Sequence, residues 1–161
     1  MSRFIIKADY GMQIKTEIAK LLTSNSEEWY NSSKLVRAEQ TAISQIRNRI
    51  GKRYDCSLIF APLPPVAIVE DGEEPGTQID SRDQWIVTIT IDITLYHLYS
   101  QTGSKDVPEH RSQRYQDAID WLKDVGNGTT TADLPMLIDE STGVEYSEFR
   151  LNSRPPENHK W

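Results

Sequence analysis

Hydrophobic residues recur at intervals of three and four in three segments of the chain, residues 10–23, 33–53 and 108–126. That spacing places the apolar side chains on one face of an α-helix. The sequence therefore predicts three amphipathic helices, each with one face in a core. The expected core positions are Ile14, Ile18, Leu21 and Leu22 in the first helix, Val36, Ile43, Ile46 and Ile50 in the second, and Tyr115, Ala118, Ile119 and Leu122 in the last.

The ends of these helices carry residues that start or stop helices. Ser32 or Ser33 can cap the second helix, and the alanines at 38 and 42 favour it further. Pro108 suits the first position of the last helix, and Glu109 complements its positive N-terminal end. Gly126 and Gly128 are expected to end that helix as a C-cap.

Residues 83–100 give two conflicting patterns. Hydrophobic and polar residues alternate strictly from Trp85 to Leu95, and many are β-branched, which is typical of a strand. The segment is long for a strand, however, and some of its apolar residues also form a helical stripe. That stripe is Trp85, Ile86, Ile89, Ile93 and Tyr96. The local pattern alone slightly favours the strand.

Two stretches lack sustained periodicity. The connection of residues 54–84 contains prolines that exclude a helix, and around Gly72 to Gly76 it can form a short β-hairpin. A loop of about 30 residues is uncommon in a compact domain unless it has a function, so we expect a contact loop. Residues 127–161 are expected to form an extended arm or a disordered tail.

Length and composition indicate one polar, water-soluble domain. The chain has 161 residues, a mean hydropathy of −0.58 and no apolar stretch approaching the roughly 18 residues of a membrane span. The apolar run near the N-terminus is too short for a secretory signal. Cys56 is the only cysteine, which excludes an internal disulfide and a thiolate zinc site. We expect a reducing cytosol, or a particle assembled there.

The net charge of −6 is unevenly distributed. Residues 34–53 are basic, whereas residues 54–84 are acidic, and the overall acidity argues weakly against a dedicated nucleic-acid binder. The basic block is either a solvated helix face or a surface for an acidic partner or the acidic loop of a neighbouring copy. The basic block contains one acidic residue, Glu39, and six basic ones, Lys34, Arg37, Arg47, Arg49, Lys52 and Arg53. The acidic block contains one basic residue, Arg82, and seven acidic ones, Asp55, Glu70, Asp71, Glu73, Glu74, Asp80 and Asp83.

Catalytic and metal-binding patterns are absent from the sequence. The three histidines, at 97, 110 and 159, have no metal-ligand spacing, and His97 is expected to pack among aromatic residues. Cys56 has no base near it in sequence. Asp117, Asp120 and Asp124 share a helix side, which is typical of a solvated face. We therefore expect no enzyme activity, no cofactor and no metal.

Three segments together resemble the small head–tail connector proteins of long-tailed bacteriophages, the adaptor or head-completion proteins of the Mu-like and HK97-like kind. The segments are "AEQTAISQIRNRIGKRYD" (38–55), "ITIDITLYHLYSQTG" (89–103) and "VPEHRSQRYQDAIDWLKDVGNG" (107–128). The matching positions are Gly51, Arg53 and Tyr54, then Asp92, Leu95, Tyr96, Leu98 and Tyr99, then Arg114, Tyr115, Ala118, Trp121, Leu122 and Gly128. Thr94 stands where the family usually carries alanine.

The resemblance implies a mainly α fold, a small four-helix bundle over residues 1–128 with a loop insertion at about 55–82 and an extended arm over 129–161. It also implies that residues 83–100 are helical. The implied function is that of a structural virion protein, assembled in the bacterial cytoplasm, that forms a ring of about twelve copies in the neck. Such a ring joins the portal protein of the DNA-filled head to a tail or stopper protein, and double-stranded DNA passes through it without sequence-specific binding.

Eight residues are candidates for contacts in such an assembly. They come from the basic helix, the acidic loop and the aromatic positions of the arm, where Trp161 is either an accident of sequence or an anchor on another chain. The candidates are Arg47, Arg49, Lys52, Arg53, Glu73, Glu74, Phe149 and Trp161. The alternatives are a nucleic-acid-binding module that uses the basic 34–53 helix, a small enzyme, and another virion or host interaction protein.

Overall fold

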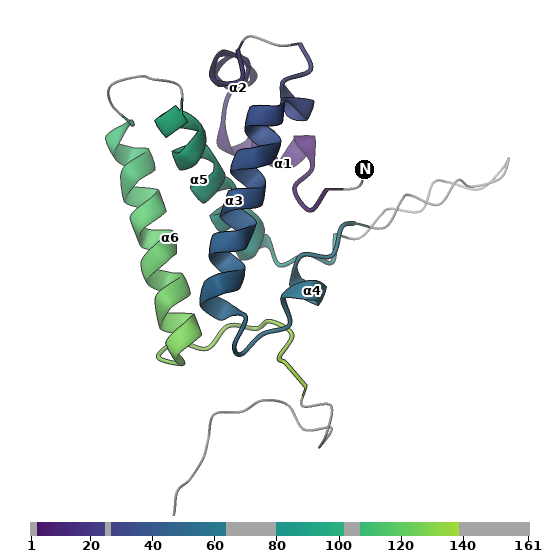
Figure 1. The fold of residues 1–161 in the computed structure, drawn as a ribbon, viewed down its shortest axis with the longest axis vertical. Coiled ribbons are helices and arrows are strands. Elements are labelled where there is room, and N and C mark those ends of the chain that lie inside the picture. The colour runs from purple at the N-terminus through teal and green to yellow at the C-terminus, as the bar shows by residue number, and fades with distance from the viewer. Residues whose placement is uncertain (1–2, 25–26, 64–79, 102–106, 139–161) are drawn as a thin grey trace, which may run out of the picture.

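A computed structural model describes residues 3–24, 27–63, 80–101 and 107–138, where helices are joined by turns and irregular segments and Tyr54 and Met136 form an isolated β-bridge (Figure 1). The expected mainly α bundle is confirmed. The helices are α1 (Lys7–Gln13), α2 (Thr16–Leu22), a 3₁₀ turn η1 (Trp29–Asn31), α3 (Ser33–Ile50), α4 (Cys56–Ile59), α5 (Gln84–Gln101) and α6 (Glu109–Asn127). The long helices α3, α5 and α6 form the bundle, while α1, α2 and η1 close its upper end in the view of Figure 1.

The segment with conflicting patterns is the central helix, α5, so the helical prediction for residues 83–100 is confirmed. It packs against α3, α6 and α1. Its buried residues face in every direction, because neighbours surround it. They are Ile86, Val87, Ile89, Thr90, Ile91, Asp92, Ile93, Thr94, Leu95 and Leu98. A helix that is buried all round needs no helical stripe, and this is why its sequence could alternate like a strand.

The hydroxyl groups of two threonines in α5 form hydrogen bonds with carbonyl groups of the same helix. Thr90 Oγ1 donates to the carbonyl of Ile86 at 2.7 Å, and Thr94 Oγ1 donates to that of Thr90 at 2.7 Å. Both side chains are fully buried. A buried hydroxyl without a partner would be costly, but bonding to the carbonyl four residues earlier removes that cost. Thr94 can therefore replace the alanine of the resembling proteins inside the core.

Helix α3 presents a different face to the core than the hydrophobic spacing predicted. The buried line runs through Leu35, Ala38, Ala42, Ile46 and Ile50. The small side chains of the two alanines leave room for close packing in the middle of the helix. Two of the predicted core positions, Val36 and Ile43, are only half-buried. The prediction was wrong for them because the alanines, not the larger residues, mark the buried face.

The predicted first helix, residues 10–23, is two short helices. At Ile14 the backbone is extended, with φ −148° and ψ 141°, so α1 ends and α2 begins in a new direction. The side chain of Ile14 is buried, but Ile18 is 37% exposed and Leu21 is 72% exposed. The prediction of one continuous helix with a buried stripe was wrong, because the break rotates Ile18 and Leu21 towards solvent.

The two glycines at the end of α6 have separate roles. Gly128 ends the helix in the left-handed conformation, with φ 79°, which confirms it as the C-cap. Gly126 lies within the helix instead, and a β-carbon there would clash with the carbonyl oxygen of Arg49 in α3. Gly126 thus allows the close approach of α3 and α6. Pro108 occupies the N-cap, one position earlier than expected.

The described part of the long connection after α3 begins with the short helix α4. Asp55 caps α4, accepting a hydrogen bond from the backbone N–H of Ser57 at 2.8 Å. Leu63 and Ser81 line the same small hollow of about 250 Å³, so the segment between them leaves and returns at one place. The expected β-hairpin lies in residues 64–79, outside the described residues.

The first residues after α6 pack across the base of the bundle. The backbone N–H of Asp55 donates to the carbonyl of Pro135 at 2.8 Å, and that of Leu137 donates to Arg53 at 2.9 Å. Tyr54 and Met136 thereby form an antiparallel bridge, and Leu134 is buried. Residues 129–138 therefore contact the helical domain. The expected boundary at residue 128 stays a prediction, and residues 139–161 lie outside the described part of the chain.

A buried arginine fastens the N-terminal segment to the start of α5. The guanidinium of Arg82 donates to the carbonyl of Phe4 and to the carboxylates of Asp9 and Asp80. The hydrogen bond from Arg82 holds the pKa of the Asp80 carboxyl well below its usual range, and the same pair raises the pKa of Arg82. Phe4 and Arg82 are 78 residues apart in the sequence, so this cluster holds the N-terminal segment against the start of α5.

We predict that Gly126→Ala and Gly11→Ala have opposite effects on stability. Both glycines lie in helices, where alanine is favoured by about 0.5–1 kcal/mol. At Gly11 a β-carbon meets nothing within 4 Å, so the free energy of unfolding should rise. At Gly126 the clash with Arg49 should outweigh the propensity and lower it. Urea denaturation of both variants checks this, and a stabilised Gly126→Ala would show that α3 and α6 are not in close contact.

We also predict a pH-dependent effect of Asp80→Asn. A carboxyl whose pKa is depressed by folding adds stability that is fully present above its unfolded pKa of about 4 and is lost as the pH falls below it. The variant should therefore be less stable than the wild type at pH 7, and the difference should shrink below about pH 4. Denaturation curves across this range test it, with the exposed Glu17→Gln as control. A difference that is independent of pH would contradict the prediction.

Candidate interaction surfaces

The candidate contact residues on α3 and just after it lie at one end of the bundle. Arg47, Arg49, Lys52 and Arg53 are within the described residues, and the structure uses each of them differently. The remaining candidates lie outside the described part of the chain. These are Glu73, Glu74, Phe149 and Trp161.

Arg49 and Lys52 meet Lys123 of α6 around a hollow of about 460 Å³, which we call the basic hollow. Asn48, Ile119, Gly126 and Asn127 complete its lining. Arg49 is half-buried and bonds the carbonyl of Gln45 at 3.1 Å, while Lys52 and Lys123 are exposed. Two helices that are far apart in sequence thus gather positive charge that can face a phosphate or a carboxylate. The basic residues of the sequence marked one side of this surface, but Lys123 could not be assigned to it from the sequence.

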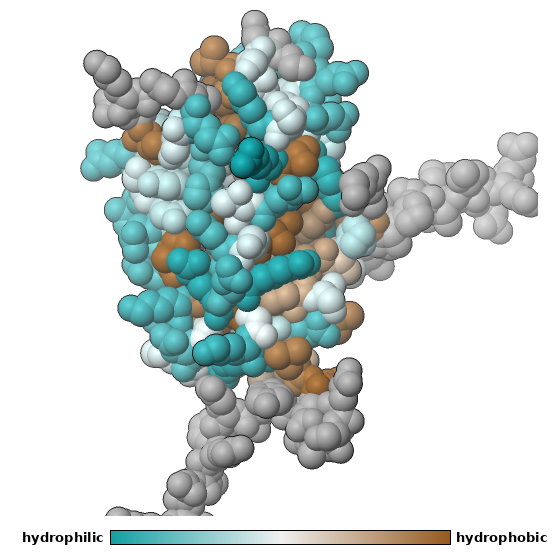
Figure 2. All heavy atoms as spheres, in the orientation of Figure 1, coloured by the Kyte–Doolittle hydropathy of each residue, from teal (hydrophilic) through white to brown (hydrophobic). Residues whose placement is uncertain are grey.

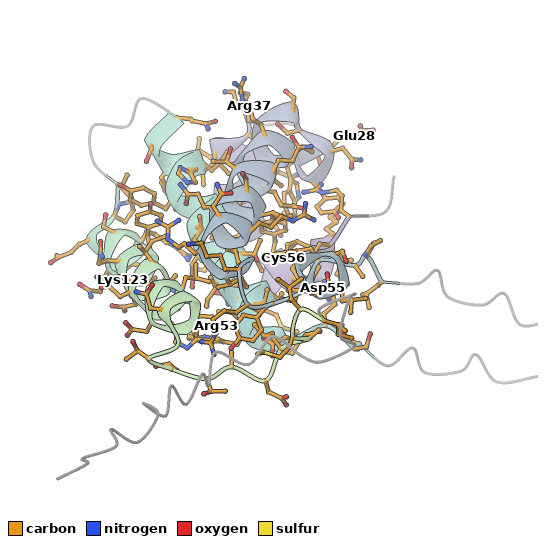
Figure 3. The ribbon with its side chains drawn as sticks, turned by 60° about the horizontal axis from the view of Figure 1, so that its bottom comes forward. Glu28, Arg37, Arg53, Asp55, Cys56 and Lys123 are labelled. Atoms are coloured by element: carbon orange, nitrogen blue, oxygen red, sulfur yellow. The ribbon has the colours of Figure 1, made fainter. Side chains whose placement is uncertain are left out.

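Arg53 is half-buried, and its contacts within the chain indicate a structural role. One of its Nη atoms donates to the carbonyl of Val125 at 2.9 Å, near the end of α6, and its guanidinium lies 5.7 Å from the ring centre of Tyr54. In Figure 3 it lies at the base of the molecule, whereas Arg37 projects from the far end of α3. A cation at the C-terminal end of a helix is favoured by the helix dipole. Arg53 therefore links the ends of α3 and α6.

Arg47 borders a second surface, an apolar groove of about 370 Å³ beside α3. Its hydrophobic lining comes from the N-terminal segment, α3 and the residues after α4, namely Phe4, Val36, Ile43, Phe60 and Pro62. Phe4 and Phe60 pack edge to face, with ring centres 5.0 Å apart, and Arg47 lies 5.5 Å from the ring centre of Phe60. Figure 2 shows hydrophobic residues gathered here between hydrophilic ones.

One end of the apolar groove is closed by a charged cluster. Glu39, which is buried in α3, pairs with Arg3 and accepts a hydrogen bond from the hydroxyl of Tyr10 at 2.9 Å. Burial alone would lower the pKa of Arg3, but the hydrogen bond and the charge of Glu39 outweigh it and raise that pKa. Because Arg3 already neutralises the charge of Glu39, the charge of Arg47 makes the edge of the groove positive.

The outer side of α6 carries the opposite charge. Asp117, Asp120 and Asp124 are exposed, and amides of Gln113 and Gln116 bond the first two at 2.9 and 3.1 Å. We call these three aspartates the acidic stripe. Their exposure agrees with the expected solvated face and leaves them accessible to a basic partner.

A charged pair that was not predicted from the sequence joins α6 to a buried carboxylate of α5. Arg114 of α6 binds both carboxylate oxygens of Asp92 in α5, at 2.7 and 2.9 Å. Arg111 approaches the same carboxylate at 3.5 Å and donates to the carbonyl of Gln13 at 2.7 Å. Asp92 and Arg114 appeared only as matching positions in the resemblance. The signal that could have predicted the pair is Asp92 itself, a single charge within an apolar run, because a buried charge requires a partner of opposite sign.

The reactive side chains do not gather at either surface. Within residues 3–24, 27–63, 80–101 and 107–138, no three His, Cys, Asp or Glu side chains form a group that could hold a metal ion. His97 packs against the rings of Tyr96 and Tyr115, and burial lowers its pKa. Burial raises the pKa of the half-buried Cys56 thiol. No described helix has the length and apolar character needed to span a membrane.

We predict that Arg53→Gln and Lys52→Gln differ in their effect on stability. Arg53→Gln removes a charged hydrogen bond to the end of α6 and should lower the free energy of unfolding by about 1.5–3 kcal/mol. Lys52→Gln removes the same charge from an exposed position and should change it by less than about 0.5 kcal/mol. Urea denaturation measures both, and equal effects would mean that Arg53 does not hold the helix ends together.

Comparisons with known proteins concern the second half of the chain. Residues 76–146 match the family model described as Bacteriophage Mu, Gp36. The matched span contains α5, α6 and the described residues 129–138, and it leaves α1 to α4 outside. Neither the curated proteins nor the solved structures include a match to the chain. Over its central helical hairpin, the chain is therefore similar to a bacteriophage structural protein family of the Mu type.

Proposed function

We propose that the chain is a structural protein of a tailed bacteriophage that forms a ring in the neck, between the portal of the head and the tail. The observation that carries this proposal is the match of residues 76–146 to Bacteriophage Mu, Gp36. The resemblance of residues 38–55 to connector proteins, which lies outside that span, supports it. The proposed ring contains about twelve copies, as the resemblance implies, and closes by a repeated head-to-tail contact.

The surfaces of the bundle support an assembly role. A head-to-tail ring requires that each copy present two different, complementary faces. The basic hollow between α3 and α6 and the acidic stripe on the outer side of α6 supply opposite charges on different faces. Complementary charge speeds association and rejects wrong partners more than it adds affinity. These charges can therefore orient neighbouring copies, or the portal and tail proteins, before closer contacts form.

The DNA channel sets a second requirement for this role. DNA must slide through the ring, so the lining must not hold its phosphates strongly. We propose that the acidic stripe faces the channel or a basic neighbour, and that the basic hollow faces another protein. A reversed orientation would hold DNA in place.

The alternative function, a nucleic-acid-binding module, has one observation in its favour. Arg49, Lys52 and Lys123 converge on the basic hollow, and converging cations are what a phosphate backbone requires. Binding of duplex DNA by the purified chain at near-physiological salt separates the two functions. Tight binding that Lys52→Gln and Lys123→Gln weaken would favour the module.

The neck role is tested by removing the chain from an assembling phage. A nonsense codon in its gene should give filled heads and separate tails that do not join in a host without a suppressor. The suppressing host serves as control and should yield complete virions. Complete virions without the chain would contradict the proposal, and so would heads that fail before filling.

Truncation gives a sharper form of this test. Deleting residues 139–161 leaves the packed residues 129–138 in place, so the bundle should melt like the intact protein. Joining of heads to tails should nevertheless be impaired, since the arm supplies contacts to other chains. A truncated chain that melts normally and still completes virions would show that the arm is dispensable.

A further inference from the structure

The apolar groove leaves hydrophobic side chains uncovered on an otherwise polar face. Val36 and Ile43, which are half-buried, line the groove together with the buried rings of Phe4 and Phe60 and the exposed Pro62. The groove's volume of about 370 Å³ lies at the lower end of the usual range for binding sites, roughly 300–1,000 Å³. It can take one or two large side chains.

The charge at the groove restricts what can fill it. Arg47 stands at its edge over Phe60, and within the described part of the chain no carboxylate pairs with Arg47. The one carboxylate of the lining, Glu39, is already paired with Arg3. A ligand that carries apolar side chains and a nearby negative charge would satisfy both features.

The chain itself contains such a sequence. Residues 139–149, DESTGVEYSEF, carry four acidic residues and no basic one, and Val144, Tyr146 and Phe149 are interleaved with the acids. A short extended peptide with alternating apolar and charged residues can place its apolar side chains in a groove and keep its charges at the rim.

The direction of the arm points to a neighbouring copy as the donor. In the antiparallel contact at the base, residue 135 bonds residue 55 and residue 137 bonds residue 53. Over residues 135–137 the chain therefore runs opposite to residues 53–55, away from Phe60 and Pro62, which follow residue 55. In Figure 1 the described part of the arm ends below α4, beyond the end of α3.

We propose that the apolar groove beside α3 binds the 139–149 segment of a neighbouring copy, with Tyr146 or Phe149 against Val36, Ile43 and Phe60 and with the acids near Arg47. The inference rests on the proposed function only in that a ring supplies the neighbour. Each copy would then give one arm and receive another, which is the repeated head-to-tail contact that a ring requires.

Binding is tested with a fluorescent peptide of residues 139–151 and the full-length chain. The chain carries Tyr146→Ser and Phe149→Ser, so that its own arm cannot compete. Fluorescence anisotropy should show saturable binding that weakens with salt. Adding Ile43→Gln or Arg47→Glu should weaken binding by about tenfold or more, the equivalent of about 1.4 kcal/mol.

Two controls decide whether the groove is the site. Arg37→Glu makes the same substitution as Arg47→Glu on an exposed residue of α3 that does not line the groove, and it should leave binding within about twofold. Thermal melting verifies that each variant is folded. No binding, or equal losses in Arg37→Glu and Arg47→Glu, would overturn the proposal.

Mixing two full-length variants tests whether the arm comes from another copy. Copies with a defective arm (Tyr146→Ser, Phe149→Ser) keep the groove, and copies with a defective groove (Ile43→Gln, Arg47→Glu) keep the arm. Sedimentation at high concentration should show little association of either alone and pairs in the mixture. Peptide binding without pairs would mean that each groove receives its own arm and would overturn the exchange between copies.

The result of the peptide-binding test can be distinguished from the result of the test of the neck role. If the peptide binds in the groove but virions assemble without the chain, the groove contact stands and the neck role fails. If virions require the chain but the peptide does not bind, the neck role stands and the groove inference fails.

Discussion

The packing of α5 against α6 depends on the pairing of a buried carboxylate in the middle of α5, where every side of the helix is covered. Asp92 lies in α5 with its side chain only 7% exposed, and Arg114 holds both of its oxygens. An unpaired buried carboxylate there would cost several kcal/mol. The two bonds from Arg114, whose own side chain is 43% exposed, therefore favour the arrangement of α6 that makes them. Arg111 lies one turn earlier in α6 and donates to the carbonyl of Gln13, which joins the end of α1 to this charged pair.

This constraint explains why the interaction surfaces lie where they do. Because the middle of α5 is covered on every side, its residues 89–95 belong to the core, and the candidate surfaces lie on the outward faces of α3 and α6. Close contact between these two helices at Gly126 brings Lys123 beside Arg49 and Lys52. On the other side of α3, the N-terminal segment and α4 do not cover Val36 and Ile43 completely, and a groove remains. The surfaces are thus consequences of how the core is packed.

Much of the fold could be predicted from the sequence. The long helices α3 and α6, the cap at Gly128 and the mainly α class followed from spacing and end signals. The helical state of α5 came from the resemblance, because a helix that is buried all round carries no periodic signal of its own. The break at Ile14 could not be predicted, since it depends on where that side chain finds the core. The interaction surfaces combine residues that are distant in sequence, such as Lys123 with Arg49 or Phe4 with Phe60, and only the fold brings these together.

Leu63 and Ser81 line one hollow, so the two ends of the intervening segment lie near each other, and this affects how its length can change. Closing a longer flexible segment between neighbouring ends costs only about 0.6 kcal/mol for each doubling of its length. The position is therefore suited to the insertion of a fluorescent or affinity module, which would leave the sequence of the helices unchanged.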